Sequence, residues 1–173
     1  MSKVYSIFRD QVITLITFSE QHLQKTFEWI GEPEFQHQFM MRSIPTWEEH
    51  NAHFKRILTD SKQVVYAINM AGEHVGNCGF KNIIEKIEAE LWIYIGSPLV
   101  RNKGVGRFAT ELLLEKGFNH FHMSSIYLHV ADFNTSARAL YQKLGFHEVP
   151  LRGDASDWSD RGCKIIRMEL EDK

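Results

Sequence analysis

The sequence predicts a single mixed α/β domain spanning residues 1–173, with helices covering a mixed β-sheet. Three observations support this prediction. Short β-branched segments alternate with amphipathic segments along the chain. Residues 64–95 contain three strand-like segments in succession. A chain of 173 residues, 43% of them hydrophobic, can bury one full core. The expected order of elements is β-α-α-β-β-β-α-β-α-β-β.

The first third of the chain is expected to form one strand and then two main helices. The strand segment, QVITLIT, is short and rich in β-branched residues. Ser19 is a suitable N-cap for the first helix, and Thr46 with Glu49 has the pattern of a capping box at the start of the second. The predicted elements are a strand over residues 11–17, a helix over 19–30, a short helical piece over 34–40 and a helix over 46–59.

The middle of the chain changes to strand character and predicts an antiparallel meander. The sequence from Ala71 to His74, AGEH, is typical of a tight turn between two strands. The predicted strands cover residues 64–70, 75–84 and 89–95.

The last part of the chain alternates between helices and strands. Its first helix has a continuous apolar stripe, and Gly145 is placed to end the second helix at the C′ position. The stripe consists of Val105, Ala109, Leu112 and Leu113. The predicted elements are helices over residues 103–118 and 134–144, strands over 125–130, 146–151 and 164–170, and a polar loop over 152–162 in which Trp158 is a candidate contact residue.

The bulk composition excludes several classes of protein. A net charge of −2 gives no general attraction to nucleic acid or to an anionic membrane, so any anion site must be local. The two cysteines, Cys78 and Cys163, are far apart and cannot form a disulfide framework or a zinc ribbon. The N-terminus lacks the apolar run of a signal peptide, and no segment is long enough to span a membrane. We therefore expect a cytoplasmic protein with no nucleic-acid or membrane partner and no metal.

A cationic, glycine-containing segment follows the third strand of the meander and begins the next helix. The first N–H groups of a helix have no intrahelical acceptor, and the helix dipole favours an anion there. Arg101, Lys103 and Arg107 add positive charge beside Gly104 and Gly106. This segment is therefore a candidate phosphate site.

Two well-known phosphate motifs fit this segment poorly. Residues 104–109 match the dinucleotide pattern G-x-G-x-x-A, but eight residues separate Ile95 from Gly104, and no acidic residue follows about 20 positions later. Too little chain remains for a full doubly wound sheet. A P-loop is excluded because the sequence has no Gly-Lys-Ser/Thr triplet.

A third interpretation accounts for more of the chain. Arg101-Asn-Lys-Gly-Val-Gly106 has the form R-x-x-G-x-G and follows the strand sequence ELWIYI. Downstream, residues 134–146 have the form N-x-x-A-x-x-x-Y-x-x-x-G-F. This combination resembles the GNAT superfamily of acetyl-CoA-dependent N-acetyltransferases, in motifs from about residue 64 to 146 and in element order over the whole chain. The resemblance implies a mixed sheet that is splayed between its fourth and fifth strands, residues 89–95 and 125–130.

The resemblance also implies how acetyl-CoA would be bound. The backbone amides from Asn102 to Arg107 would hold the pyrophosphate, and the pantetheine arm would pair with an open strand edge at residues 93–95, where a β-bulge is expected. A backbone N–H of that edge would stabilise the oxyanion. The implied cofactor-binding residues are Ile93, Tyr94, Ile95, Arg101, Asn102, Lys103, Gly104, Val105, Gly106, Arg107, Asn134 and Tyr141.

Acetyl transfer to an amine needs a proton acceptor for the amine and benefits from a proton donor for the leaving thiolate. The family tyrosine beside the CoA sulfur corresponds to Tyr141, whose alternative role is that of a core tyrosine. Glu90 is the candidate general base, directly or through water, and its alternative is a solvent-facing strand residue. Glu88 and His129 are further options. Asn134 is expected to cap its helix and, by resemblance, to contact pantetheine.

The acceptor amine is less constrained by the sequence. In this family the first helices and the loop before the last strand build the acceptor pocket, so Trp29, Phe39, Arg42 and Trp92 are candidate substrate-binding residues. The segment from Phe27 to Phe35 resembles members of the ribosomal-protein and amino-sugar acetyltransferase branch. We expect a nucleotide-linked amino sugar; a protein N-terminus or a polyamine is the alternative.

Other functions remain open at this stage. The domain could bind acetyl-CoA as a sensor without turnover; an NAD-binding module is the remote alternative. His50 and His53 have i,i+3 spacing but no further metal ligand, which favours a solvated helix face. A homodimer interface formed by exposed aromatic residues also stays open.

Overall fold

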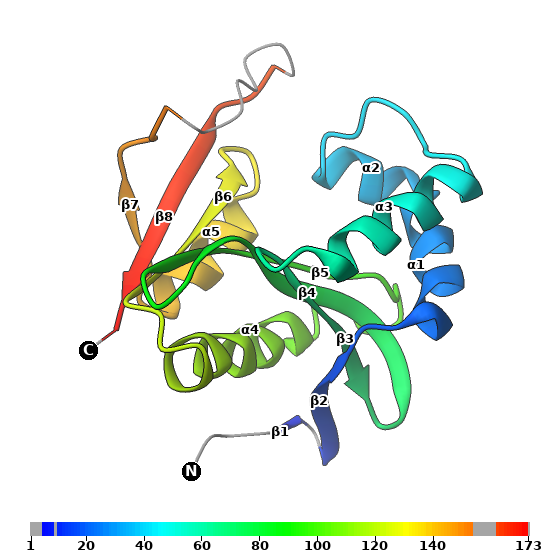
Figure 1. Ribbon diagram of the computed structural model, residues 1–173, viewed down its shortest axis with the longest axis horizontal. Coiled ribbons are helices and arrows are strands. Elements are labelled where there is room, and N and C mark those ends of the chain that lie inside the picture. The colour runs from blue at the N-terminus through cyan, green and yellow to red at the C-terminus, as the bar shows by residue number, and fades with distance from the viewer. Residues whose placement is uncertain (1–4, 9, 154–161, 173) are drawn as a thin grey trace.

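The computed structural model of the protein describes residues 5–8, 10–153 and 162–172. Trp158 and most of the polar loop predicted over 152–162 lie outside the described residues. The elements in chain order are shown in Figure 1. They are β1 (Tyr5–Phe8), β2 (Gln11–Thr17), the 3₁₀ turn η1 (Glu20–His22), α1 (Leu23–Ile30), α2 (Pro33–Gln38), α3 (Trp47–Thr59), β3 (Val64–Met70), β4 (Glu73–Ile84), β5 (Glu88–Ile95), α4 (Val105–Glu115), the π-helical turn η2 (Lys116–His120), β6 (Ser125–Ala131), α5 (Thr135–Lys143), β7 (His147–Val149) and β8 (Ile165–Glu171).

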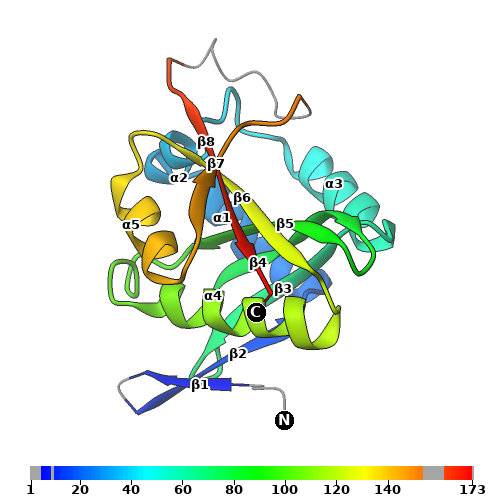
Figure 2. The ribbon, with the colours of Figure 1, turned by 90° about the vertical axis from the view of Figure 1, so that its left-hand side faces the viewer.

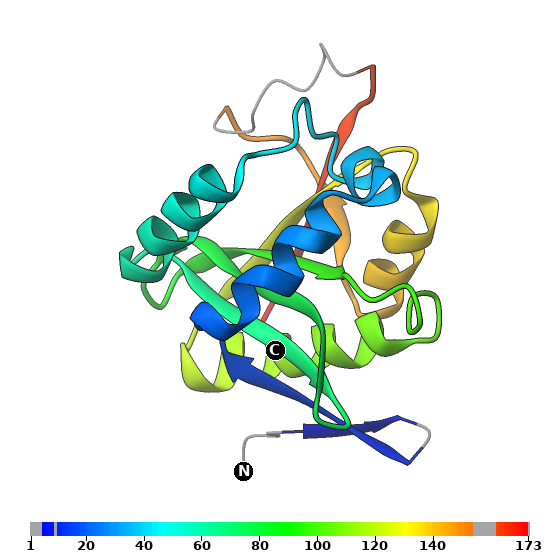
Figure 3. The same ribbon diagram turned by 90° about the vertical axis from the view of Figure 1, so that its right-hand side faces the viewer.

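The strands of the described residues form one mixed sheet in the order β1-β2-β3-β4-β5-β6-β8-β7. Strands β3, β4 and β5 pair antiparallel in succession, which confirms the predicted meander, and β2 and β1 extend the sheet beyond β3 in the same antiparallel sense. Helices α1, α2 and α3 lie over one face of the sheet, and α4 and α5 lie over the other, as Figures 2 and 3 show from opposite sides. The mixed α/β prediction is confirmed.

Local sequence signals placed most of the helix ends correctly. Thr46 and Glu49 form the predicted capping box, with Thr46 N–H donating to Glu49 Oε2 at 2.8 Å and Glu49 N–H donating to Thr46 Oγ1 at 3.2 Å. Gly145 has a φ of 98°, as expected of the residue after a helix. The apolar stripe predicted for the helix after the third meander strand lies on α4, and all four of its residues are buried.

Three features differ from the expected element list. The additional strand β1 pairs with β2 at the edge of the sheet. Strand β7 is three residues long instead of six. The helix predicted over 103–118 is α4 followed by the π-helical turn η2, which begins near Gly117. A Cβ on Gly117 would lie 2.4 Å from Ile126 Cδ1, so the chain approaches the sheet closely at this turn.

Each face of the sheet has its own apolar cluster. Under α4 and α5 the cluster contains Leu112, Ile126 and Tyr141, and it is the larger of the two. Under α1 and α3 a smaller cluster joins Phe18, Phe54 and Val65, with Trp92 packed against its edge. The sheet therefore separates two apolar clusters: one on the α4–α5 side, which we call the cofactor-side cluster, and one on the α1–α3 side.

Strands β5 and β6 pair over a short length and then separate. Their parallel register ends at Glu90↔Tyr127, although β5 continues to Ile95 and β6 to Ala131. Beyond Glu90 this edge of β5 has no strand partner among the described residues. The splayed sheet implied by the resemblance is therefore present.

The β-bulge expected at residues 93–95 is absent from its predicted place. The β4–β5 register is continuous from Gly76↔Ile95 to Lys81↔Glu90. The irregularity lies instead between Lys81 and Ile84, where Asn82 has a φ of 52°. The edge opens because β6 diverges, while the β4–β5 ladder is continuous along residues 90–95.

None of the helices in the described part of the chain has both the length and the apolar character needed to cross a membrane.

Candidate active site

The loop between β5 and α4 presents a run of unused backbone donors. Asn102 and Gly104 both adopt positive φ, 57° and 89°, and Gly104 is the N-cap of α4. Within the described residues, the N–H groups of residues 102–106 donate to no protein acceptor, whereas Arg107 N–H donates to Gly104 O. Left-handed turns of this kind gather successive N–H groups into an anion-binding concavity. The loop therefore fits a pyrophosphate.

The three cations of this loop have different surroundings. Lys103 is exposed, and Arg107 is exposed and pairs with Glu111 one turn along α4 at 3.0 Å. Arg101 is turned away from the loop surface and is mostly buried. Its guanidinium donates to Glu32 Oε2 at 2.6 Å, to Glu34 Oε2 at 2.9 Å, and to the carbonyl oxygens of Ile95 and Gly96. Most of its hydrogen-bonding capacity is thus used within the protein.

Tyr141 lies on α5 beneath the splayed strands. It is buried in the cofactor-side cluster, and its ring packs against Phe146 with centroids 5.8 Å apart. Burial raises the pKa of Tyr141 to about 12, so the hydroxyl is protonated at neutral pH. Among the described residues the hydroxyl makes no hydrogen bond, and its oxygen is not one of the fully buried unpaired atoms. A protonated O–H with no protein partner can donate to a ligand atom.

Asn134 is the N-cap of α5, as predicted. Its Oδ1 accepts a hydrogen bond from Ala137 N–H at 3.2 Å. The cap fixes the first turn of the helix that carries Tyr141, because it satisfies a donor that would otherwise be unpaired.

Glu90 occupies the point where β5 and β6 separate, and it is buried, not solvent-facing. Its Oε1 accepts from His129 Nδ1–H at 3.0 Å and from Lys81 Nζ at 3.2 Å, and its Oε2 accepts from Asn82 at 2.8 Å. Burial opposes ionisation, but the His129 hydrogen bond and the Lys81 charge outweigh it, so the pKa of Glu90 is lowered. Glu90 is therefore an ionised carboxylate at neutral pH.

The surroundings of Glu90 extend across the sheet to β8. His129 lies opposite Arg167, whose guanidinium stacks on the Tyr127 ring at 3.6 Å. Arg167 also approaches Glu169 at 3.3 Å and Glu88 at 3.8 Å. His129 Nε2 and two guanidinium nitrogens of Arg167 are buried without a hydrogen-bond partner in the described part of the chain. Glu88 itself is bound by Arg152 at 2.8 Å, so the structure gives it an ion-pair role.

The aromatic candidates for substrate binding lie on the α1–α3 side of β5. Trp29 is buried against Gly96, where a Cβ would lie 1.9 Å from the indole ring. Trp92 stacks on Tyr94 at 6.1 Å, and Phe39 meets the same ring edge-on at 5.6 Å. The Tyr94 hydroxyl accepts a hydrogen bond from Asn77, so the ring lies on the α1–α3 side of the sheet. The backbone of Tyr94 lies at the edge of β5 that β6 leaves unpaired. Trp29 is thus a packing residue that holds α1 on β5.

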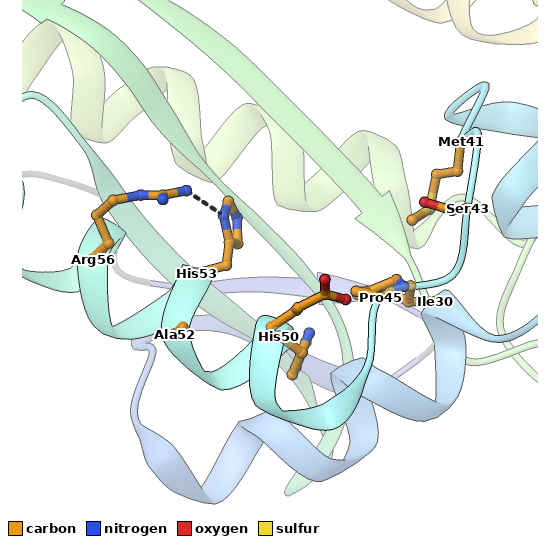
Figure 4. Close-up of a pocket in the computed structure, with 9 residues that line it drawn as sticks. Ile30, Met41, Ser43, Pro45, His50, Ala52, His53 and Arg56 are labelled. Carbon is orange, nitrogen blue, oxygen red and sulfur yellow. Dashed lines mark hydrogen bonds between the residues drawn. The ribbon is translucent and has the colours of Figure 1, made fainter.

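Arg42 lies on the exposed segment between α2 and α3, close to a pocket that the sequence did not reveal. The pocket has a volume of about 610 Å³ and lies between this segment and α3, as Figure 4 shows. Its charged and polar side chains come mainly from one side of α3. It is lined by Ile30, Met41, Ser43, Pro45, Glu49, His50, Ala52, His53 and Arg56.

Of the two histidines of this pocket, His53 is exposed, as predicted for a solvated helix face, whereas His50 is not. His50 is buried, and its Nε2–H donates to Leu23 O at 3.1 Å. Desolvation lowers the pKa of His50, and desolvation together with the Arg56 charge lowers that of His53. Arg56 donates to His53 Nδ1 at 3.2 Å. No group of three potential metal ligands occurs among the described residues.

Comparison with known proteins agrees with this geometry. The model of the acetyltransferase (GNAT) domain family matches residues 13–147. The chain is 22% identical to an N-acetyltransferase 9-like protein of Nematostella vectensis, over 90% of this chain and 89% of that protein. Its fold is similar to that of Vibrio cholerae spermidine N-acetyltransferase in complex with CoA and spermine, with a TM-score of 0.80, 21% identity, and coverage of 92% and 95% of the two chains. It is also similar to Campylobacter jejuni N-acetyltransferase PseH in complex with acetyl coenzyme A, with a TM-score of 0.69, 19% identity, and coverage of 93% and 99%.

The splayed sheet, the donor-rich loop and the buried tyrosine define a transferase that takes its acyl group from a CoA thioester. The chain belongs to the GNAT acetyltransferase family. It is an acetyl-CoA-dependent N-acetyltransferase that acts on an amine, and acetyl-CoA is its co-substrate.

Proposed function

We propose that the acceptor is the amino group of a nucleotide-linked amino sugar, as in the amino-sugar members of this family. The observation that supports this most directly is the pocket beside α3. Its volume of about 610 Å³ is in the range of small-molecule sites. Arg56 and Ser43 offer donors to a phosphate oxygen, while Ile30, Met41 and Pro45 provide an apolar wall for a ring.

A polyamine acceptor is less well supported, because it would need unpaired carboxylates. Glu32 and Glu34 are bound by Arg101, and Glu49 binds the N-cap residue Thr46. Among the pocket residues, Arg56 would repel a polycation. A protein N-terminus remains the second alternative.

We further propose that Glu90 removes the proton from the acceptor ammonium, directly or through a water. Three donors occupy its carboxylate, which leaves room for one more hydrogen bond. The neutral amine then attacks the thioester carbonyl carbon, the C–N bond forms, and a backbone N–H of residues 93–95 stabilises the oxyanion. The C–S bond breaks, Tyr141 donates a hydrogen bond to the sulfur, and the proton lost by the attacking nitrogen ends on the thiol. Glu90 finally releases its proton to solvent.

The proton acceptor can be assigned by substitution on both sides of the Glu90–His129 hydrogen bond. We expect Glu90→Gln to reduce turnover by about 100-fold or more while acetyl-CoA affinity is retained. His129→Gln should have a smaller effect if His129 only orients the carboxylate. If His129→Gln abolishes turnover and Glu90→Gln does not, the base is His129.

The acceptor class can be tested by measuring CoA release with a panel of amines. The panel should contain UDP- and dTDP-linked amino sugars, short peptides with free N-termini, and spermidine. We expect turnover with a nucleotide-linked amino sugar. No turnover with any amino sugar, together with turnover of a peptide or of spermidine, would reject this acceptor. Tight acetyl-CoA binding with no turnover of any amine would instead identify a sensor.

Two neighbouring cations on α3 provide a matched pair of variants for this panel. Arg56 lines the pocket, whereas the exposed Lys55 next to it does not. Arg56→Gln should raise the acceptor KM by about tenfold, the usual effect of losing one charged hydrogen bond. Lys55→Gln removes the same charge from the helix and should leave KM unchanged.

A further inference from the structure

The guanidinium of Arg101 joins two parts of the protein that are far apart in sequence. On one side, its Nε donates to Ile95 O at 3.0 Å and its Nη2 to Gly96 O at 2.6 Å, at the end of β5. On the other side, it binds the carboxylates of Glu32 and Glu34, at the start of α2. We call this arrangement the Arg101 clasp.

Helix α2 in turn reaches across the gap between the two splayed strands. Phe35 packs edge-on against Tyr94 of β5, with ring centroids 4.8 Å apart. His37 stacks at 5.2 Å on Phe133, which follows β6. Just after the helix, Met40 Sδ lies 2.9 Å from Cys163 Sγ, close to the start of β8. Helix α2 therefore contacts the protein on both sides of the splay, and the Arg101 clasp holds its first turn.

Arg101 is also the first residue of the donor-rich loop. The next residues, 102–106, carry the unpaired N–H groups that fit a pyrophosphate. Four of the five N–H donors of the Arg101 guanidinium are already used within the clasp. The exposed Lys103 is better placed to meet a phosphate than Arg101 is.

We propose that Arg101 is a positioning residue that couples acetyl-CoA binding to helix α2, and that it does not bind the pyrophosphate through its guanidinium. A phosphate bound by residues 102–106 restrains the backbone that carries Arg101. The restrained side chain holds Glu32 and Glu34 more persistently, so α2 opens less often. Since Phe39 and Arg42 follow the clasp along the chain, acetyl-CoA would order one wall of the acceptor site before the amine binds. This last step rests on the acceptor location proposed above.

The coupling can be measured with CoA alone, without any acceptor. Hydrogen–deuterium exchange of the whole protein should show that CoA slows exchange in residues 102–107, where it binds, and also in residues 33–41, by about threefold or more. In Arg101→Gln the protection of 33–41 by CoA should disappear. The protection of 102–107 should remain, and CoA affinity should fall by less than about threefold.

Matched variants separate the clasp from a general loss of charge. The double variant Glu32→Gln/Glu34→Gln leaves the loop untouched and should reproduce the loss of CoA-dependent protection in α2. Arg107→Gln removes a nearby cation in the first turn of α4, which pairs with Glu111 on the same helix, and it should leave the protection of α2 intact.

Two results would overturn the proposal. The first is exchange in residues 33–41 of the unsubstituted protein that is the same with and without CoA, because the clasp would then be a static packing contact. The second is a loss of CoA affinity of more than about tenfold in Arg101→Gln, as expected of a direct phosphate ligand. Neither result depends on which amine is the substrate, so a wrong acceptor class would leave the measurement unaffected.

Discussion

At the scale of single residues, the proposed mechanism divides the proton chemistry between Tyr141 and Glu90, which lie on opposite faces of the sheet. Tyr141 lies in the apolar cluster under α5, whereas Glu90 lies in a polar, ion-paired region on the opposite face. The apolar surroundings keep the phenol protonated, and the cationic surroundings keep the carboxylate ionised. A donor and an acceptor of protons can thus coexist at the same pH.

Replacing Tyr141 by Phe removes the hydroxyl and keeps the ring that packs on Phe146. We expect turnover to fall by about tenfold or more, because the leaving thiolate loses its hydrogen-bond donor, with little change in acetyl-CoA affinity. Steady-state kinetics and equilibrium binding measure the two quantities. Tyr66→Phe is the control, since Tyr66 is a buried core tyrosine near Lys116. Unchanged turnover in Tyr141→Phe would return Tyr141 to a packing role.

Because its pKa is lowered below the usual 4.5, Glu90 makes stability depend on pH. Its ion pairs contribute at pH values above 4.5, and this contribution is lost as the pH falls through the lowered pKa. Glu90→Gln should therefore reduce the free energy of unfolding by about 1–2 kcal/mol at neutral pH, a modest amount because Lys81 is half-exposed. The difference in the free energy of unfolding between the two proteins should decrease at acidic pH. Urea unfolding at several acidic pH values measures this difference. A difference that is independent of pH would contradict the lowered pKa of Glu90.

At the scale of elements, the start of α4 depends on Gly104 far more than on Gly106. Gly104 has a φ of 89°, which an L side chain adopts only with strain. Gly106 has ordinary helical surroundings, and a Cβ there would lie 3.7 Å from Ile95 Cγ1, an ordinary contact.

Alanine substitutions at these glycines should have opposite effects on stability. We expect Gly104→Ala to lower the free energy of unfolding by about 1–2 kcal/mol and to weaken CoA binding, because the N–H groups of the loop lose their alignment. Gly106→Ala should raise stability by up to about 1 kcal/mol through helix propensity. Chemical denaturation and CoA titration of both proteins provide the measurements. Equal effects of the two substitutions would mean that the left-handed turn at Gly104 is unimportant.

Elements with local sequence signals were predicted best. The capping box at Thr46, the cap at Asn134 and the turn at Gly145 are encoded within a few residues, and all three are present. The contacts that the sequence did not predict join distant segments. Arg101 meets Glu32 across 69 positions, and His129 meets Glu90 across 39. Which charge pairs with which is decided by the register of the sheet and the docking of α2, and neither is encoded locally.

At the scale of the whole molecule, ligand binding should be visible as a change in stability. CoA that binds only the folded protein adds about 2.7 kcal/mol at a concentration 100 times its dissociation constant. The thermal unfolding midpoint should therefore rise with CoA concentration and should not respond to NAD. Differential scanning fluorimetry with both ligands is sufficient. A response to NAD with none to CoA would contradict the proposed use of the β5–α4 loop.

The short parallel contact between β5 and β6 also bears on how the chain reaches its native state. Strands β3, β4 and β5 are joined by short turns, so the contacts between them close short loops. The three residue pairs of β5 and β6 must instead close over the whole of α4 and η2. Contacts between distant segments form more slowly than local ones. We therefore expect the β3–β5 meander to fold while the C-terminal strands are still unstructured, so that the opening between β5 and β6 is completed late in folding.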